Sequence, residues 1–242
     1  MQCLIGVATR HSSPSHPRAM AVLAHLTRHP KNCHQLVFKY SSLLPMLQAA
    51  TASPDREARR YAFCALQNLS MDKSCRAPIA HSPRIIWSLT EQCRNSTSSS
   101  VSAGDEVEAR MAAVATLQNL SDEPANLIQF TIVKVCIGTI IRIAREDVVK
   151  CEQTDLTSFM AKNTLVTLSH WFRKIATSGS ERMMGNACNS ISEINTNILQ
   201  LHGSNGSMSP GVHSNMTPGG TRSKSILFHN PRLEPTVYNQ WS

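Results

Sequence analysis

Histidine and cysteine are the side chains in this sequence with the widest chemical range. There are ten histidines and eight cysteines, enough for a zinc site or for a thiol nucleophile with an imidazole base. A zinc site needs ligands paired at close spacing, and the cysteines form no Cys-x-x-Cys. Cys33 and His34 are adjacent, but the sequence indicates no group that would orient the base. We therefore expect no metal, and we expect reduced thiols, with Cys64 and Cys136 at apolar helix positions.

The motifs of the common enzyme classes are missing as well. There is no Gly-x-Gly-x-x-Gly, Walker loop, His-Glu-x-x-His or Gly-x-Ser-x-Gly. The few carboxylates include Asp55, Glu57, Asp105, Glu106 and Glu108, which stand at expected helix starts, where the helix dipole accounts for them better than acid–base catalysis does. The sequence predicts a protein that is not an enzyme, with no catalytic residues, no cofactor and no small-molecule substrate.

The polar positions that do form a pattern belong to a repeat. Residues 65–70 read Ala-Leu-Gln-Asn-Leu-Ser, and residues 116–121 read Thr-Leu-Gln-Asn-Leu-Ser. Apolar residues recur around both copies at the spacing of one helix face. The leucine directly before the serine or threonine that ends each copy, here called its anchor leucine, recurs about every 43 to 51 residues. The anchor leucines are Leu26, Leu69, Leu120 and Leu168.

This pattern resembles the armadillo repeat over about residues 1–175. Residues 44–47, Leu-Pro-Met-Leu, fit the second helix of that repeat, and residues 66–70 fit the end of its third. The glycine that the family has between the first and second helices is missing, and Ser42, Arg84 and Cys136 stand near its position. The resemblance implies an all-α fold, a right-handed α-solenoid of about 3.5 repeats over residues 1–176. We expect a capping helix over residues 177–201 and a disordered, low-complexity tail over residues 202–242.

The resemblance also implies a binding face. One residue before each anchor leucine stand His25, Asn68, Asn119 and Thr167. In armadillo proteins, asparagines at this position line the concave groove and hydrogen bond the main chain of an extended peptide, because an amide both donates and accepts. The alternative is that Asn68 and Asn119 bond neighbouring loops of their own chain.

A second set of positions indicates which peptides the groove would accept. The importin alpha branch carries tryptophan four residues before the asparagine, where this chain has Ala21, Cys64, Ala115 and Asn163. A lysine-rich cargo is therefore disfavoured, and the net charge of +8 opposes it too. We expect a protein–protein interaction module, or scaffold, whose partner is an extended acidic or neutral peptide.

The positive charge supports a second function. A pI near 9.3 is typical of proteins that bind nucleic acid or an anionic membrane surface. Arg56, Arg59 and Arg60, together with the tail, would make that contact. The first residues lack the basic start and long apolar core of a secretory signal, so we expect a cytoplasmic or nuclear protein. The most apolar stretch, residues 127–144, is interrupted by Lys134 and Arg142 and is predicted to divide between two helices.

Several helix starts are predicted from capping residues. Ser13 and Ser53, each followed by proline, are expected to be N-caps, Asp105 is expected to open a capping box with Glu108, and Asp155 is expected to cap the last long helix. Stretches 95–104 and 145–154 are expected to be loops inserted into the repeat. Residues 1–11 are predicted to be the end of a second helix, so that the chain begins inside a repeat. That start predicts either an incomplete chain or an apolar edge covered by a partner or by the tail.

Overall fold

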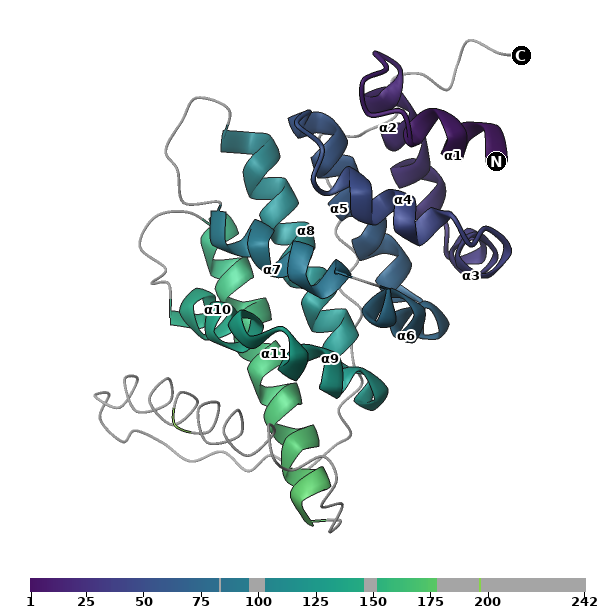
Figure 1. The fold of residues 1–242 in the computed structure, drawn as a ribbon. Helices are drawn as coiled ribbons and strands as arrows, with labels where there is room; N and C mark the ends of the chain where they lie inside the picture. Colours follow the sequence, from purple (N-terminus) through teal and green to yellow (C-terminus); the bar gives the residue numbers. More distant parts are fainter. Residues whose placement is uncertain (83, 96–102, 146–151, 178–195, 197–242) are drawn as a thin grey trace, which may run out of the picture. The chain divides into compact units, whose positions relative to one another are not determined.

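The computed structural model describes residues 1–82, 84–95, 103–145 and 152–177, together with Thr196. Every regular element in these ranges is a helix, and they contain no strand (Figure 1). The prediction of an all-α fold is therefore confirmed for the described part of the chain. The predicted capping helix and the predicted tail lie outside the described residues, apart from Thr177 and Thr196.

The bounds of the described helices are α1 Gln2–Ala8, α2 His16–Thr27, α3 Pro30–Lys39, α4 Leu43–Ala50, α5 Arg56–Met71, α6 Lys73–His81, α7 Ile85–Asn95, α8 Ala103–Ser121, the 3-10 turn η1 Pro124–Asn126, α9 Leu127–Ile132, α10 Lys134–Arg145 and α11 Glu152–Thr177. Helices α2, α5, α8 and α11, here called the long helices, are each separated from the next by two or three other elements. The apolar stretch 127–144 divides between α9 and α10, as predicted.

The long helices pack on one another in chain order. Helix α5 contacts both α2 and α8, and α8 also contacts α11. A shorter helix packs on each of them: α1 on α2, α4 on α5, α7 on α8 and α10 on α11. Three anchor leucines, Leu69, Leu120 and Leu168, are fully buried, whereas Leu26 on α2 is only partly buried. The long helix nearest the N-terminus therefore has less cover than the three that follow it.

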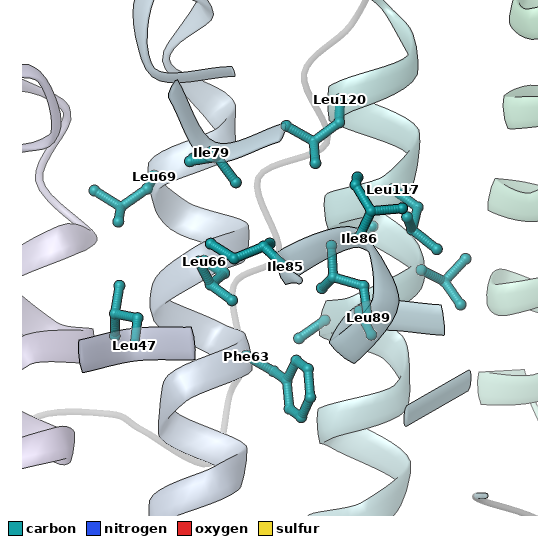
Figure 2. Close-up of a cluster of buried hydrophobic side chains, with 14 of the residues drawn as sticks. Leu47, Phe63, Leu66, Leu69, Ile79, Ile85, Ile86, Leu89, Leu117 and Leu120 are labelled. Carbon is teal, nitrogen blue, oxygen red and sulfur yellow. The ribbon is translucent and has the colours of Figure 1, made fainter. Parts of the chain in front are cut away.

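The core lies between the long helices and the short ones that cross them. Figure 2 shows Leu66 on α5 and Leu117 on α8 on either side of Ile85 and Leu89 from α7. These four side chains are at most 1% exposed. Small residues such as Ala62 and Ala113, both completely buried, let neighbouring helices approach closely. The alanines and leucines that recur in the sequence thus form the packed faces of these helices.

The corner between α1 and α2 is held by a buried histidine. His16 is 1% exposed, and its Nδ1 lies 2.8 Å from the carbonyl oxygen of Ala8, to which it donates. Burial lowers the pKa of His16, which keeps the ring neutral at neutral pH.

Two predicted N-caps are wrong by two residues. Helix α2 begins at His16, with Ser15 as its N-cap residue and Pro17 in its first turn. Helix α5 begins at Arg56, and its cap is Asp55, whose Oδ1 accepts from the backbone N–H of Ala58 at 2.7 Å. Ser13 Oγ and Ser53 Oγ instead accept from the backbone N–H two residues on, at Ser15 and Asp55, so each Ser-Pro pair belongs to the turn before its helix.

The other two predicted caps lie inside helices. Helix α8 begins at Ala103, so Asp105 belongs to its first turn. Helix α11 begins at Glu152, so Asp155 is also within the helix. Of the predicted loop 95–104, Ala103 and Gly104 are helical, Asn95 ends α7, and the remainder lies outside the described residues.

The backbone before α7 has a conformation that favours glycine, although an arginine stands there. Arg84, directly before α7, has a φ of 64°, in the left-handed region that favours glycine. Ser42 holds the corresponding place before α4 with a φ of −78°, which any residue adopts. The loop before α7 therefore keeps a glycine conformation without the glycine.

Arg84→Gly is expected to raise the free energy of unfolding by about 1 kcal/mol, because it removes the steric cost of a left-handed Cβ. Thermal unfolding followed by circular dichroism measures the change. The control is Ser42→Gly, which relieves no strain, adds backbone freedom to the unfolded chain and should lower stability. An equal response of the two variants would contradict this interpretation.

Among the described residues, no single helix is long and apolar enough to cross a membrane. The successive segments Pro124–Ile132 and Val135–Arg145 would pass together by length and composition, but the chain bends by 98° between them.

Candidate functional site

Asn68 and Asn119 occupy corresponding places on α5 and α8, and both are half-buried. Asn68 Nδ2 donates to the carbonyl oxygen of Ala24 at 3.1 Å and to Thr27 Oγ1 at 3.2 Å, both on α2. Asn119 Nδ2 donates to Ser70 Oγ on α5 at 2.9 Å. Each asparagine therefore bonds the long helix that precedes its own.

The orientation of both amides follows from their partners. A carbonyl oxygen only accepts, so the atom of Asn68 that faces Ala24 is the nitrogen. Ser70 Oγ gives its hydrogen to the carbonyl oxygen of Gln67 at 2.7 Å and therefore accepts from Asn119. Thr27 Oγ1 likewise donates to Ala24, at 2.8 Å, and accepts from Asn68. We refer to these hydroxyl–amide pairs, Thr27 with Asn68 and Ser70 with Asn119, as the amide ladder.

The ladder leaves the amide oxygens unused. Neither Asn68 Oδ1 nor Asn119 Oδ1 accepts a hydrogen bond from a described residue, and neither is among the fully buried unpaired atoms. Both hydrogens of Asn68 are engaged within the chain, so toward a ligand this side chain can only accept. The nitrogens of both asparagines bond their own chain, as the alternative expects, but the partners lie on the preceding long helix rather than in loops.

His25 and Thr167 take no part in the ladder. His25 is exposed on α2, Thr167 is half-buried on α11, and neither makes a side-chain hydrogen bond with another described residue. Ser121, the counterpart of Ser70, donates to Gln118 at 2.7 Å in the same way. The next helix offers it a threonine in place of an asparagine, and no third ladder bond forms there.

Two further asparagines close the C-terminal ends of long helices. Asn32 Nδ2 donates to the carbonyl oxygen of Leu26 at 2.9 Å, and Asn126 Nδ2 donates to that of Leu120 at 3.0 Å. In the intervening repeat, Arg76 Nε donates to the carbonyl oxygen of Ser70 at 3.0 Å. These bonds satisfy carbonyls that a helix end leaves without a partner, so we assign these residues to the fold rather than to a site.

The junction of α5 and α8 carries a charged network that sequence analysis missed. Arg59 Nη2 donates to Glu106 Oε1 at 2.6 Å, and Gln92 Nε2 donates to the other oxygen of Glu106 at 3.0 Å. Burial raises the pKa of Glu106, but the hydrogen bonds from Gln92 and Arg59 and the charge of Arg59 outweigh it, so that the net shift is downward.

Arg60 is the most enclosed cation of this network, with its side chain 12% exposed. Its Nη1 donates to Glu108 Oε2 at 2.9 Å. Its Nε lies 2.9 Å from Asp105 Oδ1, an ion pair without the alignment of a hydrogen bond, and its guanidinium lies 4.2 Å from the centre of the Tyr61 ring. Two arginines of the predicted basic cluster are thus neutralised within the chain. Only the sequence spacing of basic and acidic residues, 47 or 48 apart and close to one repeat, could have indicated this pairing.

One group of side chains has the residue types of a catalytic triad. Ser74 Oγ donates to Asp72 Oδ1 at 2.7 Å and lies 3.0 Å from His34 Nδ1. Because the hydroxyl hydrogen points to Asp72, His34 is the donor to Ser74. Nucleophilic catalysis requires the reverse, with the serine donating to the imidazole. The group joins α3 to α6 and is not arranged for acyl transfer.

The described cysteines are suited to packing rather than to catalysis. All six are free thiols, and Cys33, Cys75, Cys93 and Cys136 are buried. Burial raises the pKa of Cys64, Cys75 and Cys136 to about 12, so these thiols are protonated at neutral pH. Within the described ranges, no three histidine, cysteine or acidic side chains come together as metal ligands would.

A scan against protein-family models finds no match, and a search of curated proteins finds no similar sequence. Among solved structures, this chain is similar to an engineered protein of the Northeast Structural Genomics Consortium, at 14% sequence identity and a TM-score of 0.41. The alignment covers 81% of this chain and 96% of the engineered one. At that TM-score the likeness supports no conclusion about fold or function.

Proposed function

We propose that this chain is a protein–protein interaction module built as a right-handed, armadillo-like α-solenoid of about 3.5 repeats. Its ligand is an extended peptide of acidic or neutral character, bound along the face that carries Asn68 and Asn119. The observation that supports this proposal most directly is the amide ladder. It holds two amide oxygens in corresponding positions on successive long helices, each without a donor among the described residues.

An extended peptide presents main-chain N–H groups at regular intervals, whatever its side chains. An amide oxygen fixed by bonds through its own nitrogen is already oriented, so accepting from such a group costs little further side-chain entropy. Asn68 is therefore expected to contribute through its oxygen alone, which is narrower than the donor-and-acceptor role expected from sequence, whereas Asn119 keeps one amide hydrogen beside its oxygen. His25 and Thr167 would be flanking contacts rather than parts of the ladder.

Binding of nucleic acid or an anionic membrane through Arg56, Arg59 and Arg60 receives less support. Arg59 and Arg60 are paired with carboxylates of α8, so their charges are largely compensated before any ligand arrives. We therefore do not advance this function for that cluster.

The test starts from a displayed library of unstructured acidic and neutral peptides selected against the whole chain. Fluorescence anisotropy then gives the affinity of a selected peptide. Asn68→Ala combined with Asn119→Ala should weaken binding about tenfold, since two hydrogen bonds are lost. Thr27→Val combined with Ser70→Ala is the matched control, because it breaks the same ladder from the other side but removes neither amide, and it should weaken binding less, through the lost preorganisation alone.

If the control weakens binding as much as the asparagine variant does, the amides act only through the fold. If no peptide is selected, or the asparagine variant binds as tightly as the unchanged chain, the proposal is wrong. Circular dichroism of both variants shows whether each is still folded.

A further inference from the structure

The same four positions recur on each long helix, eleven, eight, four and one residue before its anchor leucine. Helices α5, α8 and α11 each contact the preceding long helix, and none of their residues at these positions is exposed; two of them, Asn68 and Asn119, bond that helix. They are Ala58, Tyr61, Ala65 and Asn68 on α5, then Ala109, Ala112, Thr116 and Asn119 on α8, then Thr157, Met160, Thr164 and Thr167 on α11. Each of these stripes receives a helix.

At α2 the corresponding residues are Ser15, which is its N-cap residue, and Arg18, Val22 and His25; we call these four the α2 stripe. All four are exposed, and Val22 is 46% exposed where its counterparts Ala65 and Thr116 are completely buried. The spacing that accepts a helix elsewhere in the chain is thus present here without a described helix on it. This also explains why the anchor leucine of α2 is only partly buried.

The α2 stripe differs from the others in charge. An arginine stands where α8 has a small buried alanine, so a helix like α5 packed in the same way would bury the Arg18 cation unpaired. Residues 1–54 contain five lysines and arginines, five histidines and no aspartate or glutamate. Arg18 makes no salt bridge with a described residue. A carboxylate for Arg18 must therefore come from outside α1–α4.

We propose that the α2 stripe is the docking site for an acidic amphipathic helix of another protein. Carboxylates of that helix pair with Arg18, and its apolar side chains cover Val22. The junction of α5 and α8 uses the same chemistry, since Arg59 and Arg60 on one long helix pair with Glu106 and Glu108 on the next. This interface lies at the edge of the helix stack and goes beyond the peptide face proposed above.

Other occupants fit the charge less well. The exposed side of α11 carries Phe159, Lys162 and Val166, and its described side chains from 156 to 175 include no acidic residue, so α11 of a second copy would bring cation against cation. Residues 178–242 hold three glutamates against four lysines and arginines. Residues 146–155 are acidic, so a second copy would also bring carboxylates, and dimerisation is therefore measured in the experiment below. Nucleic acid would require aromatic faces or several phosphate-binding cations, and Val22 supplies neither.

The experiment uses the full chain and a synthetic helical peptide of about 20 residues, long enough to be helical in water, with leucine on one face and glutamate beside it. Isothermal titration gives its affinity, and a peptide with lysine for every glutamate is the charge control. Arg18→Glu should weaken binding of the acidic peptide about tenfold, since a repulsion replaces an attraction. Lys162→Glu makes the same charge change at an exposed position on α11 and should alter the affinity less than about twofold.

Val22→Asp is the second variant, and it should weaken binding because it places a charge in the apolar part of the contact. The proposal is overturned if the acidic peptide does not bind, or if it binds no better than the lysine peptide. It is also overturned if Arg18→Glu and Lys162→Glu have equal effects. Tighter binding of a single-stranded oligonucleotide of matched charge, or a dimer in light scattering that Arg18→Glu dissolves, would overturn it as well. If no extended peptide binds the face that carries Asn68, the results of this experiment do not change. Each of the two proposals can therefore be overturned without the other.

Discussion

Replacing Leu69 by alanine is expected to lower the free energy of unfolding by about 3 kcal/mol. Leu69 is completely buried on α5, the helix that contacts both α2 and α8, and it lies among the core side chains drawn in Figure 2, so its truncation leaves a cavity that relaxes only in part. Urea unfolding, followed by the far-ultraviolet circular dichroism of the helices, measures the loss.

Leu26→Ala is the matched control, because Leu26 holds the same place on α2 and is only partly buried. Its cost should be about half as large, since less of the side chain leaves water on folding. If both variants lose the same stability, Leu26 is covered in solution by something that the described residues do not supply. That outcome would also bear on the α2 stripe, where a second copy is one candidate cover.

Arg60→Ala is expected to cost about 2 kcal/mol, at the lower end for breaking a buried ion pair because its carboxylate partners remain partly exposed. The change removes the ion pairs with Asp105 and Glu108 and the contact with the Tyr61 ring, and it leaves two acidic side chains close together at the start of α8. Chemical unfolding at neutral pH measures the loss. Lowering the pH to protonate the carboxylates should reduce the difference between the variant and the unchanged chain.

The control is Arg94→Ala. Arg94 is 50% exposed and pairs with Glu91 one helical turn away, a kind of pair worth less than about 0.5 kcal/mol. Equal losses for Arg60→Ala and Arg94→Ala would show that the network between α5 and α8 adds nothing beyond a surface pair.

The helices and their buried faces could be predicted because their signal is local and repeated. Leu69, Leu120 and Leu168 recur with alanines at helical spacing, and each is completely buried in the structure. The solenoid arrangement and the number of repeats stay proposals. A periodic sequence indicates that units stack, whereas their handedness depends on small rotations between units, which the period of the repeat does not reveal.

The helix starts and the partners of the site residues could not be read in this way. Asp105 has the form of a capping residue, but α8 starts before it, and its side chain and those of Glu106 and Glu108 pair with arginines on α5. Tertiary pairing outweighed the local signal. The repeat pattern singles out Asn68, but its partners on α2 lie more than 40 residues away, and sequence spacing does not reveal which atoms of an amide remain unused.

The hydroxyl–amide pairs also have a direction along the chain. In each pair the acceptor, Thr27 or Ser70, comes earlier in the sequence than the donor, Asn68 or Asn119. A chain leaving the ribosome presents its N-terminal part first. Each asparagine therefore emerges after the helix that carries its hydroxyl, so the ladder bonds can form in the order of synthesis, α5 on α2 and then α8 on α5.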